Sequence, residues 1–266
     1  MIGEGGYGCV YLGNHCEGRM QGASKVVNHA DALREIANGK RIRKIPEYQH
    51  YFVPVESSCV VHSPHYRKTC HALDYMYHND YTVLTFPYIP TVPTVFDRSV
   101  FVQMLPHLSK LVKAKMIHFD LKAENVLLTP KPLLIDFGLS IDMKKINLRD
   151  DFFIYGPKQC VWPIEVHLLC YAMDHRFTPT SIEKVCREVY QHNPFLEDLD
   201  ECIQHYSFLS TCTGKEAVRR LLHGWKTWDL YALTLLLFHT EEVDALRPNL
   251  HYDPKKRLSI SASRLA

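Results

Sequence analysis

The spacing of apolar residues changes near residue 88 of the chain. Up to that point, short apolar runs bounded by glycine, proline and polar residues predict strands. The expected strands are 52–55, 59–61 and 81–86. One helix is expected before them, over 32–45, with Asp31 as its N-cap and Pro46 as its stop, because an aspartate side chain can accept from free backbone N–H groups.

Beyond a proline-punctuated segment at 87–93, apolar residues recur at helical spacing. Phe101, Leu105 and Leu108 begin this pattern, and we expect Pro106 to distort that helix. Two short apolar strands follow, at 126–128 and 133–135. Most of the remaining sequence has a helical pattern.

The apolar run at 230–238 is nine residues long, well short of the ~20 that a membrane span needs. We expect it to be a buried core helix. Further helical runs are expected at 181–190 and 196–206. A strand-rich N-terminal part and a helix-rich C-terminal part predict a two-lobed α+β chain.

The composition is that of an ordinary globular protein, 46% hydrophobic and 23% charged, which excludes disordered and fibrous chains. The net charge of +2 is too balanced for a protein that grips nucleic acid along a whole face. Nine cysteines without any Cys-x-x-Cys pair predict reduced thiols rather than a disulfide framework. The N-terminus also lacks a secretory signal pattern, so we expect a cytoplasmic or nuclear protein with no membrane partner.

Residues 3–10 fit the pattern G-x-G-x-x-G-x-V, in which glycines let the backbone approach phosphate groups. Alone, this pattern favours an ordinary glycine turn. However, Lys25 follows on an expected strand, from which its ammonium can reach phosphates, and Glu35 on the next helix is the natural carboxylate to hold it. We interpret Cys9 as a small filler rather than a redox-sensitive thiol.

Two later segments carry groups suited to phosphoryl transfer. They are His118-Phe119-Asp120-Leu121-Lys122-Ala123-Glu124-Asn125 and Asp136-Phe137-Gly138. Transfer to a hydroxyl needs a carboxylate that accepts the hydroxyl proton and oxygen ligands for Mg²⁺. Asp120 suits the first task, and Asn125 and Asp136 suit the second. Lys122 can lie against the transferred phosphate.

These motifs, in this order, resemble the eukaryotic-type protein kinase family. Three C-terminal segments extend the resemblance. They are Trp162-Pro163-Ile164-Glu165, which is similar to A-P-E; Asp229-Leu230-Tyr231-Ala232-Leu233, which is similar to the start of the buried helix whose aspartate holds the catalytic loop; and Asp253-Pro254-Lys255-Lys256-Arg257, which is similar to the motif whose arginine pairs with the A-P-E glutamate.

The resemblance implies a bilobal protein kinase-like α+β fold. The small β-rich N-lobe would span about 1–86, the hinge about 87–93 and the larger helical C-lobe about 94–266, with an insert at about 171–223. It also implies the site residues. The catalytic residues would be Asp120, Lys122, Lys25 and Glu35; ATP would contact Ile2, Gly3, Glu4, Gly5, Gly6, Tyr7, Gly8, Val10, Ala23, Lys25, Phe86, Tyr88 and Leu127; and Mg²⁺ would be held by Asn125 and Asp136.

The chain departs from the family pattern at Phe119, where the H-R-D arginine normally receives a phosphate on the activation loop. Between Gly138 and Pro163 the only hydroxyl side chains are Ser140 and Tyr155. The two observations agree, so we expect no activation by loop phosphorylation.

Two further departures concern the N-terminal part. Gly39 stands where the family has an apolar side chain that stacks toward the D-F-G phenylalanine, so we expect a gap there. Only two residues precede Gly3, which fits a fragment, a misplaced start or a stunted first strand, and we expect ATP affinity to suffer.

The reading that these residues favour is a Ser/Thr protein kinase that uses ATP and Mg²⁺ and acts on protein substrates, because Lys122 follows the Ser/Thr pattern. Two alternatives remain: a pseudokinase that scaffolds a partner through its insert, and a small-molecule kinase of the aminoglycoside or choline type. The compact lobes, the H-F-D motif and the short tail are also similar to divergent kinases of large DNA viruses. A zinc site is a separate alternative, although its spacings match no common structural site. Its ligands would come from Cys59, His62, His65, Cys70, His71 and His78.

Overall fold

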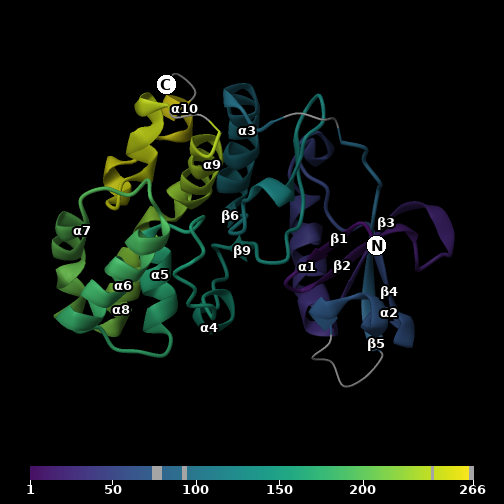
Figure 1. Cartoon of the computed structure of the whole chain (residues 1–266), viewed down its shortest axis with the longest axis horizontal. Coiled ribbons are helices and arrows are strands. Elements are labelled where there is room, and N and C mark those ends of the chain that lie inside the picture. Colours follow the sequence, from purple (N-terminus) through teal and green to yellow (C-terminus); the bar gives the residue numbers. More distant parts are fainter. Residues whose placement is uncertain (74–79, 92–94, 241–242, 264–266) are drawn as a thin grey trace. The chain divides into compact units, whose positions relative to one another are not determined.

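A computed structural model of the chain describes residues 1–73, 80–91, 95–240 and 243–263. The chain divides into two compact units (Figure 1). Unit 1 comprises Met1–Thr94 with Glu124–Ser140, and unit 2 comprises Val95–Ala123 with Ile141–Ala266. Residues 92 and 93 of the expected hinge lie outside the described residues, as does His78.

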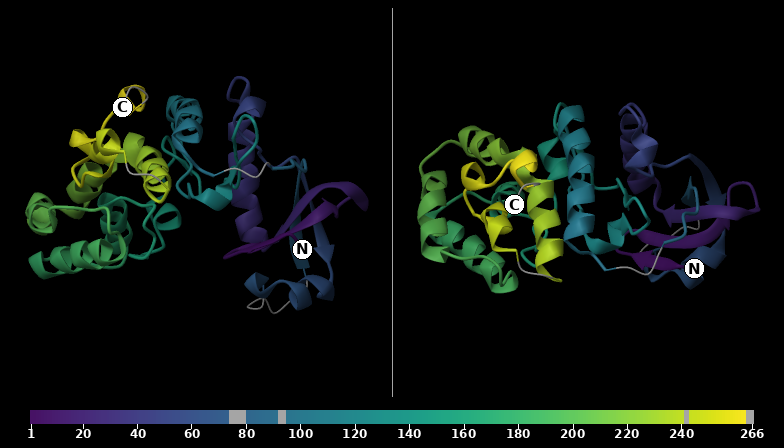
Figure 2. Two further views of the ribbon diagram at one scale, coloured as in Figure 1. Left: turned by 45° about the horizontal axis from the view of Figure 1, so that its top comes forward. Right: turned by 90° about the horizontal axis from the view of Figure 1, so that it is seen from above.

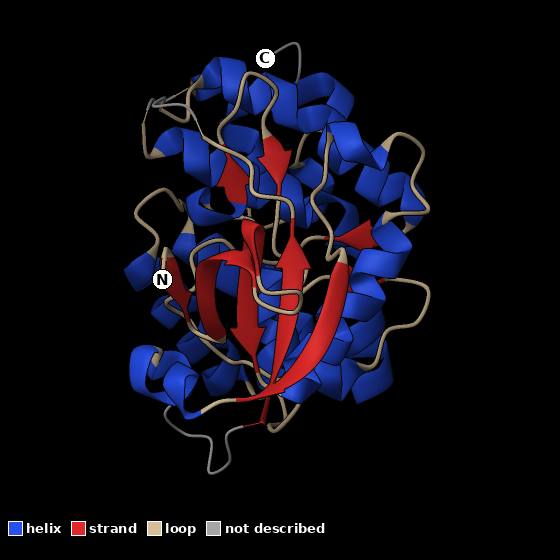
Figure 3. Cartoon of the chain, turned by 90° about the vertical axis from the view of Figure 1, so that its right-hand side faces the viewer, coloured by secondary structure: helices blue, strands red, loops and turns tan. Residues whose placement is uncertain are grey.

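Unit 1 is built on an antiparallel five-stranded sheet with the order β1-β2-β3-β5-β4 (Figure 3). The strands are β1 (Gly3–Gly5), β2 (Gly8–Asn14), β3 (Arg19–Val27), β4 (Ser57–His62) and β5 (Asp80–Phe86). The expected strands 59–61 and 81–86 are confirmed. In the register, Lys25 on β3 lies opposite Val10 on β2 and Leu84 on β5, so it occupies the middle of the sheet.

The expected strand at 52–55 is wrong. Phe52 forms only an isolated bridge with Leu134, fixed by hydrogen bonds from the Val53 N–H to the Leu134 carbonyl (3.0 Å) and from the Leu134 N–H to the Tyr51 carbonyl (2.9 Å). Pro54 has no N–H to extend such a ladder.

Helix α1 (His29–Ile42) begins and ends three residues earlier than expected. Its N-cap is Asn28, whose side-chain oxygen accepts a hydrogen bond from the Asp31 N–H at 2.9 Å. The expectation that Asp31 caps the helix is therefore wrong. Asp31 lies in the first turn, where a negative charge favours the helix dipole.

The smaller described elements up to Leu73 and from Ala123 to Leu134 are one short α-helix, three 3₁₀ helices and a two-stranded sheet. They are η1 (Tyr48–His50), α2 (Pro64–Thr69), η2 (His71–Leu73), η3 (Ala123–Asn125), β7 (Val126–Leu127) and β8 (Leu133–Leu134). Strands β7 and β8 pair with each other and confirm the two short strands expected there.

Two disulfides cross-link unit 1, Cys9–Cys70 and Cys16–Cys59. The expectation of reduced thiols is therefore wrong for these four cysteines, and Cys9 is not a mere filler. The register brings together sulfurs that are far apart in sequence, which a count of cysteines and a search for Cys-x-x-Cys cannot detect. The cytoplasmic or nuclear prediction loses its cysteine argument, and the zinc alternative loses Cys59 and Cys70 as thiolate ligands.

Unit 2 is mainly helical, and Figure 2 shows its helices from teal through green to yellow. Its elements are α3 (Arg98–Ala114), β6 (Met116–Ile117), β9 (Ile141–Asp142), α4 (Leu148–Asp151), α5 (Ile164–Ala172), α6 (Pro179–His192), α7 (Leu199–Tyr206), η4 (Ser207–Ser210), α8 (Gly214–Leu221), η5 (Leu222–Thr227), α9 (Trp228–Phe238), η6 (Asp244–Leu250), η7 (Pro254–Lys256) and α10 (Ile260–Ser263).

Helix α9 confirms the buried core helix expected at 230–238, because nearly all its residues are buried, polar ones included. Helices α6 and α7 confirm the helical runs expected in the insert, and α3 continues through Pro106. Within the described residues, no helix combines the length and the apolar character needed to cross a membrane.

Candidate active site

Unit 1 contains a cavity of about 300 Å³, a size at the lower end of small-molecule pockets. Its walls are largely apolar, with four charged side chains. The lining residues are Ile2, Gly3, Val10, Ala23, Lys25, Glu35, Val53, Phe86, Pro87, Tyr88, Ile89, Glu124, Leu127, Ile135 and Asp136. Most of these lining residues belong to the motifs identified in the sequence.

The β1–β2 ribbon forms one wall of the cavity. The Ile2 N–H donates to the Val10 carbonyl at 2.8 Å, which adds a rung beyond Gly3. Gly8 packs so closely on β3 that a Cβ atom there would lie 2.2 Å from the Val26 carbonyl oxygen. Glycine is thus required at this position by the approach of two strands.

The expected nucleotide contacts divide into two groups. Ile2, Gly3, Val10, Ala23, Lys25, Phe86, Tyr88 and Leu127 line the cavity. Glu4, Gly5, Gly6, Tyr7 and Gly8 are not among its lining residues. The second group makes up the turn of the ribbon and its flanks.

Lys25 lies at the polar end of the cavity between two carboxylates. Its Nζ is 2.9 Å from Glu35 Oε2 and 2.7 Å from Asp136 Oδ1. Burial disfavours the ammonium, but Glu35 and Asp136 outweigh it and raise the pKa of Lys25 above its ordinary value. Burial also raises the pKa of Glu35 to about 7, against the effect of Lys25. The Lys25 ammonium is therefore held in a fixed position beside the Glu35 and Asp136 carboxyl groups.

Hydrogen bonds from one side chain of helix α1 hold the segment that follows Asp136. The buried Asn38 amide donates to the carbonyls of Phe137 and Ser140, both at 2.8 Å. Asp136 itself has φ of +61°, and its Oδ1 accepts from the Gly138 N–H at 3.3 Å. Asn38 thus helps fix the chain that presents Asp136 to the cavity.

The gap expected beside Gly39 does not exist. The 54–55 segment packs directly on this glycine, where a Cβ would lie 3.4 Å from the Val55 nitrogen. Phe137 packs instead against Phe52, edge to face with ring centroids 5.8 Å apart, and both rings are buried. The apolar side chain that packs against Phe137 thus comes from Phe52, after η1, and not from helix α1.

Asp136 and Asn125 provide the oxygens that could bind a divalent cation. Asp136 lines the cavity, whereas Asn125 is buried at the end of η3 and its carbonyl accepts from the Ile135 N–H at 3.0 Å. A carboxylate oxygen and an amide oxygen are donors of the kind that Mg²⁺ prefers. The residue types fit the expected metal.

Sequence reasoning missed three lining residues, Val53, Glu124 and Ile135. Two of them had a signal, because Glu124 directly precedes Asn125 and Ile135 directly precedes Asp136. Val53 had none, because its position follows from the bridge between 52 and 134.

The other two expected catalytic residues belong to unit 2. Lys122 Nζ lies 2.9 Å from Asp120 Oδ2. The loop before them is held by the buried Asp229 at the start of α9, whose carboxylate accepts from the N–H groups of His118 (2.7 Å) and Phe119 (3.0 Å). This confirms the part expected of Asp229. Burial raises the pKa of Asp229, although His118 and these N–H donors oppose that shift.

Phe119, in place of the H-R-D arginine, joins a buried aromatic cluster. Its ring stacks on Trp162 at 4.9 Å and meets Phe152 edge to face at 5.6 Å. Trp228 completes the cluster at 6.2 Å. Apolar packing thus connects the loop at 118–125 to the segment between Gly138 and Pro163, where an H-R-D arginine would instead bind a phosphate.

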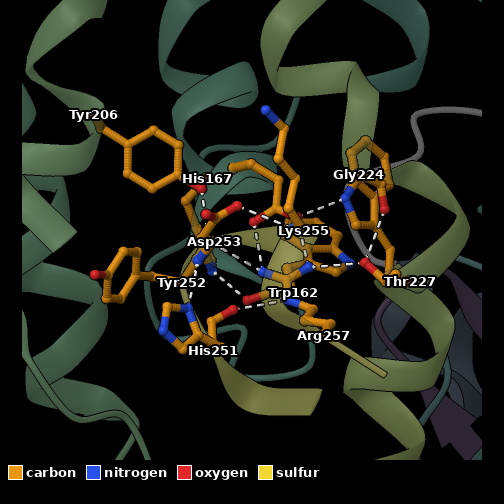
Figure 4. Close-up of polar contacts among 12 residues, drawn as sticks. Trp162, His167, Tyr206, Gly224, Thr227, His251, Tyr252, Asp253, Lys255 and Arg257 are labelled. Atoms are coloured by element: carbon orange, nitrogen blue, oxygen red, sulfur yellow. Dashed lines mark hydrogen bonds and ion pairs between the residues drawn. The ribbon is translucent and has the colours of Figure 1, made fainter. Parts of the chain in front are cut away.

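Glu165 and Arg257 form the expected buried ion pair. Figure 4 shows the polar contacts around Arg257. The guanidinium donates from both terminal nitrogens, at 2.6 Å to Oε1 and 2.9 Å to Oε2 of Glu165. Trp228 Nε1 donates to Glu165 Oε1 at 3.0 Å, and Arg257 also donates to Thr227 Oγ1 at 3.0 Å. The pairing inferred from the two motifs is confirmed.

Both hydroxyls between Gly138 and Pro163 are already engaged or covered. Ser140 is buried. The Tyr155 hydroxyl donates to Glu188 Oε2 on α6 at 2.6 Å, and its pKa is raised by burial and by that carboxylate. Cys160 Sγ also donates to the His192 carbonyl at 3.0 Å, so the insert contacts this segment at two points.

The sequence profile of the protein kinase domain matches residues 1–154, which include the glycine loop, Lys25, Asp120, Asn125 and the D-F-G segment. No curated protein sequence gives a significant match to the chain. The β-sheet of unit 1 and the helices of the chain agree with that domain. The matched residues exceed half of the 266, and the chain therefore belongs to the eukaryotic-type protein kinase family.

Proposed function

We propose that this protein is a Ser/Thr protein kinase that transfers the γ-phosphate of ATP to hydroxyls of protein substrates. The observation that carries the proposal is the position of Lys25 in the unit 1 cavity, within 2.9 Å of both Glu35 and Asp136. A lysine fixed by one carboxylate beside a second carboxylate is suited to phosphates and their metal ion.

The apolar part of the cavity suits an adenine ring. Val10, Ala23 and Leu127 line the cavity and provide apolar contacts. Within the part of the chain that the structure describes, the backbone of Tyr88 and Ile89 makes no hydrogen bond. Both residues line the cavity, so their backbone groups can pair with the edge of the base.

Catalysis rests on Asp120 and Lys122. Asp120 would accept the proton of the substrate hydroxyl, and Lys122 would stabilise negative charge that develops on the transferred group. Mg²⁺, when bound by Asn125 and Asp136, would neutralise charge on the phosphate oxygens. Lys122 in this position is the pattern on which the Ser/Thr preference is based.

The test is transfer from labelled ATP with Mg²⁺ to a generic basic protein, compared between the wild type and Asp120→Asn. We expect Asp120→Asn to reduce transfer by at least about 10²-fold while ATP binding persists, because a carboxamide cannot accept the proton. Phosphoamino acid analysis of the product determines Ser/Thr preference. Aminoglycoside and choline acceptors, tested in parallel, address the small-molecule alternative.

Two outcomes would redirect the assignment. ATP binding without transfer to any acceptor would favour a nucleotide-binding scaffold that acts through the 171–223 insert. Equal turnover by Asp120→Asn and the wild type would remove Asp120 from the mechanism.

A further inference from the structure

The β1–β2 ribbon presents opposite faces to two different environments. Because side chains alternate along a strand, Val10 faces the nucleotide cavity while its neighbours Cys9 and Tyr11 point away from it. There they are buried in a cluster with Tyr66 and Cys70, from the segment at 64–73. This segment therefore packs against the back of the cavity wall.

Several links join the 64–73 segment to the ribbon, among them a contact of 3.5 Å between His71 Nδ1 and Glu4 Oε2. Cys9 forms its disulfide with Cys70, and the Tyr11 hydroxyl lies 2.9 Å from Thr69 Oγ1. On β1, the Glu4 carboxylate accepts from the Ala72 N–H at 2.9 Å, and this hydrogen bond is the largest cause of the lowered pKa of Glu4. Glu4 on β1 lies opposite Cys9 on β2 in the register. The 64–73 segment therefore bonds to both strands of the ribbon at the same pair of residues.

The ribbon needs such fastening because β1 is an edge strand. It has three residues, all exposed, and among the residues that the structure describes it pairs only with β2. Within the described residues, the hydrogen-bond partners of its backbone lie on the ribbon itself. An edge this short has few contacts to oppose local opening.

We propose that the Cys9–Cys70 disulfide, assisted by the Glu4–Ala72 hydrogen bond, positions the glycine-rich turn for the phosphates, so that nucleotide affinity depends on whether this bond is formed. The inference rests on the proposed function, because it assumes that ATP occupies the cavity. A preformed turn binds phosphates without a further ordering cost, whereas a free turn must be ordered on binding. Cys9 and Cys70 are positioning residues that do not touch the ligand.

The second disulfide is a matched control. Cys16–Cys59 closes 43 residues against 61 for Cys9–Cys70, so the two have nearly the same expected effect on the unfolded chain. Cys16 lies beyond Asn14, at the end of β2 that is remote from Gly8, and neither Cys16 nor Cys59 lines the cavity.

The experiment measures binding of a non-hydrolysable ATP analogue with Mg²⁺, and of adenosine, to three full-length proteins. They are the wild type, Cys9→Ala/Cys70→Ala and Cys16→Ala/Cys59→Ala. We expect loss of the first disulfide to weaken analogue binding about tenfold and adenosine binding less than about twofold, because only the triphosphate needs the turn. The control variant should bind both ligands as the wild type does.

A second measurement covers the case in which Cys9→Ala/Cys70→Ala does not fold. The Cys16→Ala/Cys59→Ala protein is assayed before and after treatment with a dithiol, with mass spectrometry reporting the state of Cys70. Reduction transfers two electrons, the S–S bond breaks, each sulfur gains a proton, and the dithiol closes to its own disulfide. The same selective loss of analogue affinity is expected.

Equal losses for adenosine and the analogue, equal losses in the two double variants, or no loss after reduction would each overturn the inference while the kinase assignment stands. Failure of the oxidised wild type to bind either ligand would overturn both. Glu4→Ala provides an independent check. We expect it to weaken binding of the ATP analogue less than loss of the disulfide does, and to leave adenosine binding nearly unchanged.

Discussion

The ring of Phe119 stacks on Trp162, and the Phe119 carbonyl accepts a hydrogen bond from Trp162 Nε1 at 2.6 Å. Phe119 has φ of +69°, a conformation that is unfavourable for a bulky residue. The hydrogen bonds from its N–H to Asp229 and to its carbonyl from Trp162 compensate for that strain. The loop that carries Asp120 is therefore held by hydrogen bonds and aromatic packing that require no phosphate group.

Phe119→Ala should lower the free energy of unfolding by about 3 kcal/mol, because it removes a buried ring from a packed aromatic cluster. Phe153 is a suitable control, since its ring is 52% exposed in the same segment. Phe153→Ala should change stability by less than about 0.5 kcal/mol. Denaturant unfolding of both variants checks this, and equal effects would mean that the cluster does not stabilise the loop.

Kinase activity should not depend on phosphorylation of the segment between Gly138 and Pro163. Ser140 is buried and Tyr155 is bonded to Glu188, so the segment is ordered without a phosphate. Phosphatase treatment and Tyr155→Phe should each leave the transfer rate within about twofold of the untreated protein. The measurement is the initial rate, with intact mass reporting phosphate content. A rate that falls as phosphate is removed would contradict this account.

Gly8→Ala should destabilise unit 1 by about 2 kcal/mol and weaken ATP binding, because the new Cβ would lie 2.2 Å from the Val26 carbonyl oxygen and force β2 away from β3. Gly6, in the turn of the same ribbon, has no atom within 4 Å of an added Cβ. Gly6→Ala should therefore leave the melting temperature nearly unchanged. If the two variants melted alike, the close approach at Gly8 would not be a constraint.

The sequence predicted the parts of the site that belong to local motifs. Lys25 meets Glu35, as its place on the next helix predicted, and the D-F-G residue Asp136 lies beside them. Each is presented by a strand, a helix or a turn that the local pattern specifies. Helix ends were less accurate, since Asn28 and Asp31 are both good caps and only the backbone conformation decides between them.

Contacts between distant segments were beyond sequence reasoning. The Cys9–Cys70 pair depends on the register of β2 and on the position of the 64–73 segment. Phe52 provides the apolar contact to Phe137 that a side chain at position 39 would otherwise make. Nothing in the sequence near residue 52 indicates this contact. Asn38 had no signal either, because a polar residue on a helix is usually solvated and this one is buried against two carbonyls.

Glu165→Gln should cost about 3 kcal/mol of stability, because it leaves the buried Arg257 guanidinium without its counter-charge. Burial opposes the charged form of Arg257, and Glu165 outweighs it and raises the pKa of Arg257. The control is Glu216→Gln, which removes the partner of two exposed arginines, Arg219 and Arg220. Surface pairs contribute little, so that variant should unfold close to the wild type. Comparable destabilisation by both substitutions would argue against a special role for the buried pair.

The pH dependence of stability should show a contribution from His167, which is fully buried on α5 with Nε2 3.1 Å from the Trp162 carbonyl. Burial lowers the pKa of His167 to about 4, against the raising effect of nearby backbone carbonyls. Its pKa in the unfolded chain is about 6.5. Between these values the unfolded state binds more protons, so stability is lost as pH falls from 6.5 toward 4. The loss between pH 7 and pH 5 should be about 2 kcal/mol.

His167→Gln keeps a donor for the Trp162 carbonyl and removes the titrating ring, so its stability should fall less steeply over the same pH range. His175→Gln alters an exposed histidine three residues beyond the end of α5 and should retain the slope of the wild type. Denaturant unfolding of the three proteins at pH 7, 6 and 5 separates this contribution from that of the carboxylates, which all three share. Parallel curves for His167→Gln and the wild type would show that His167 does not remain neutral through burial.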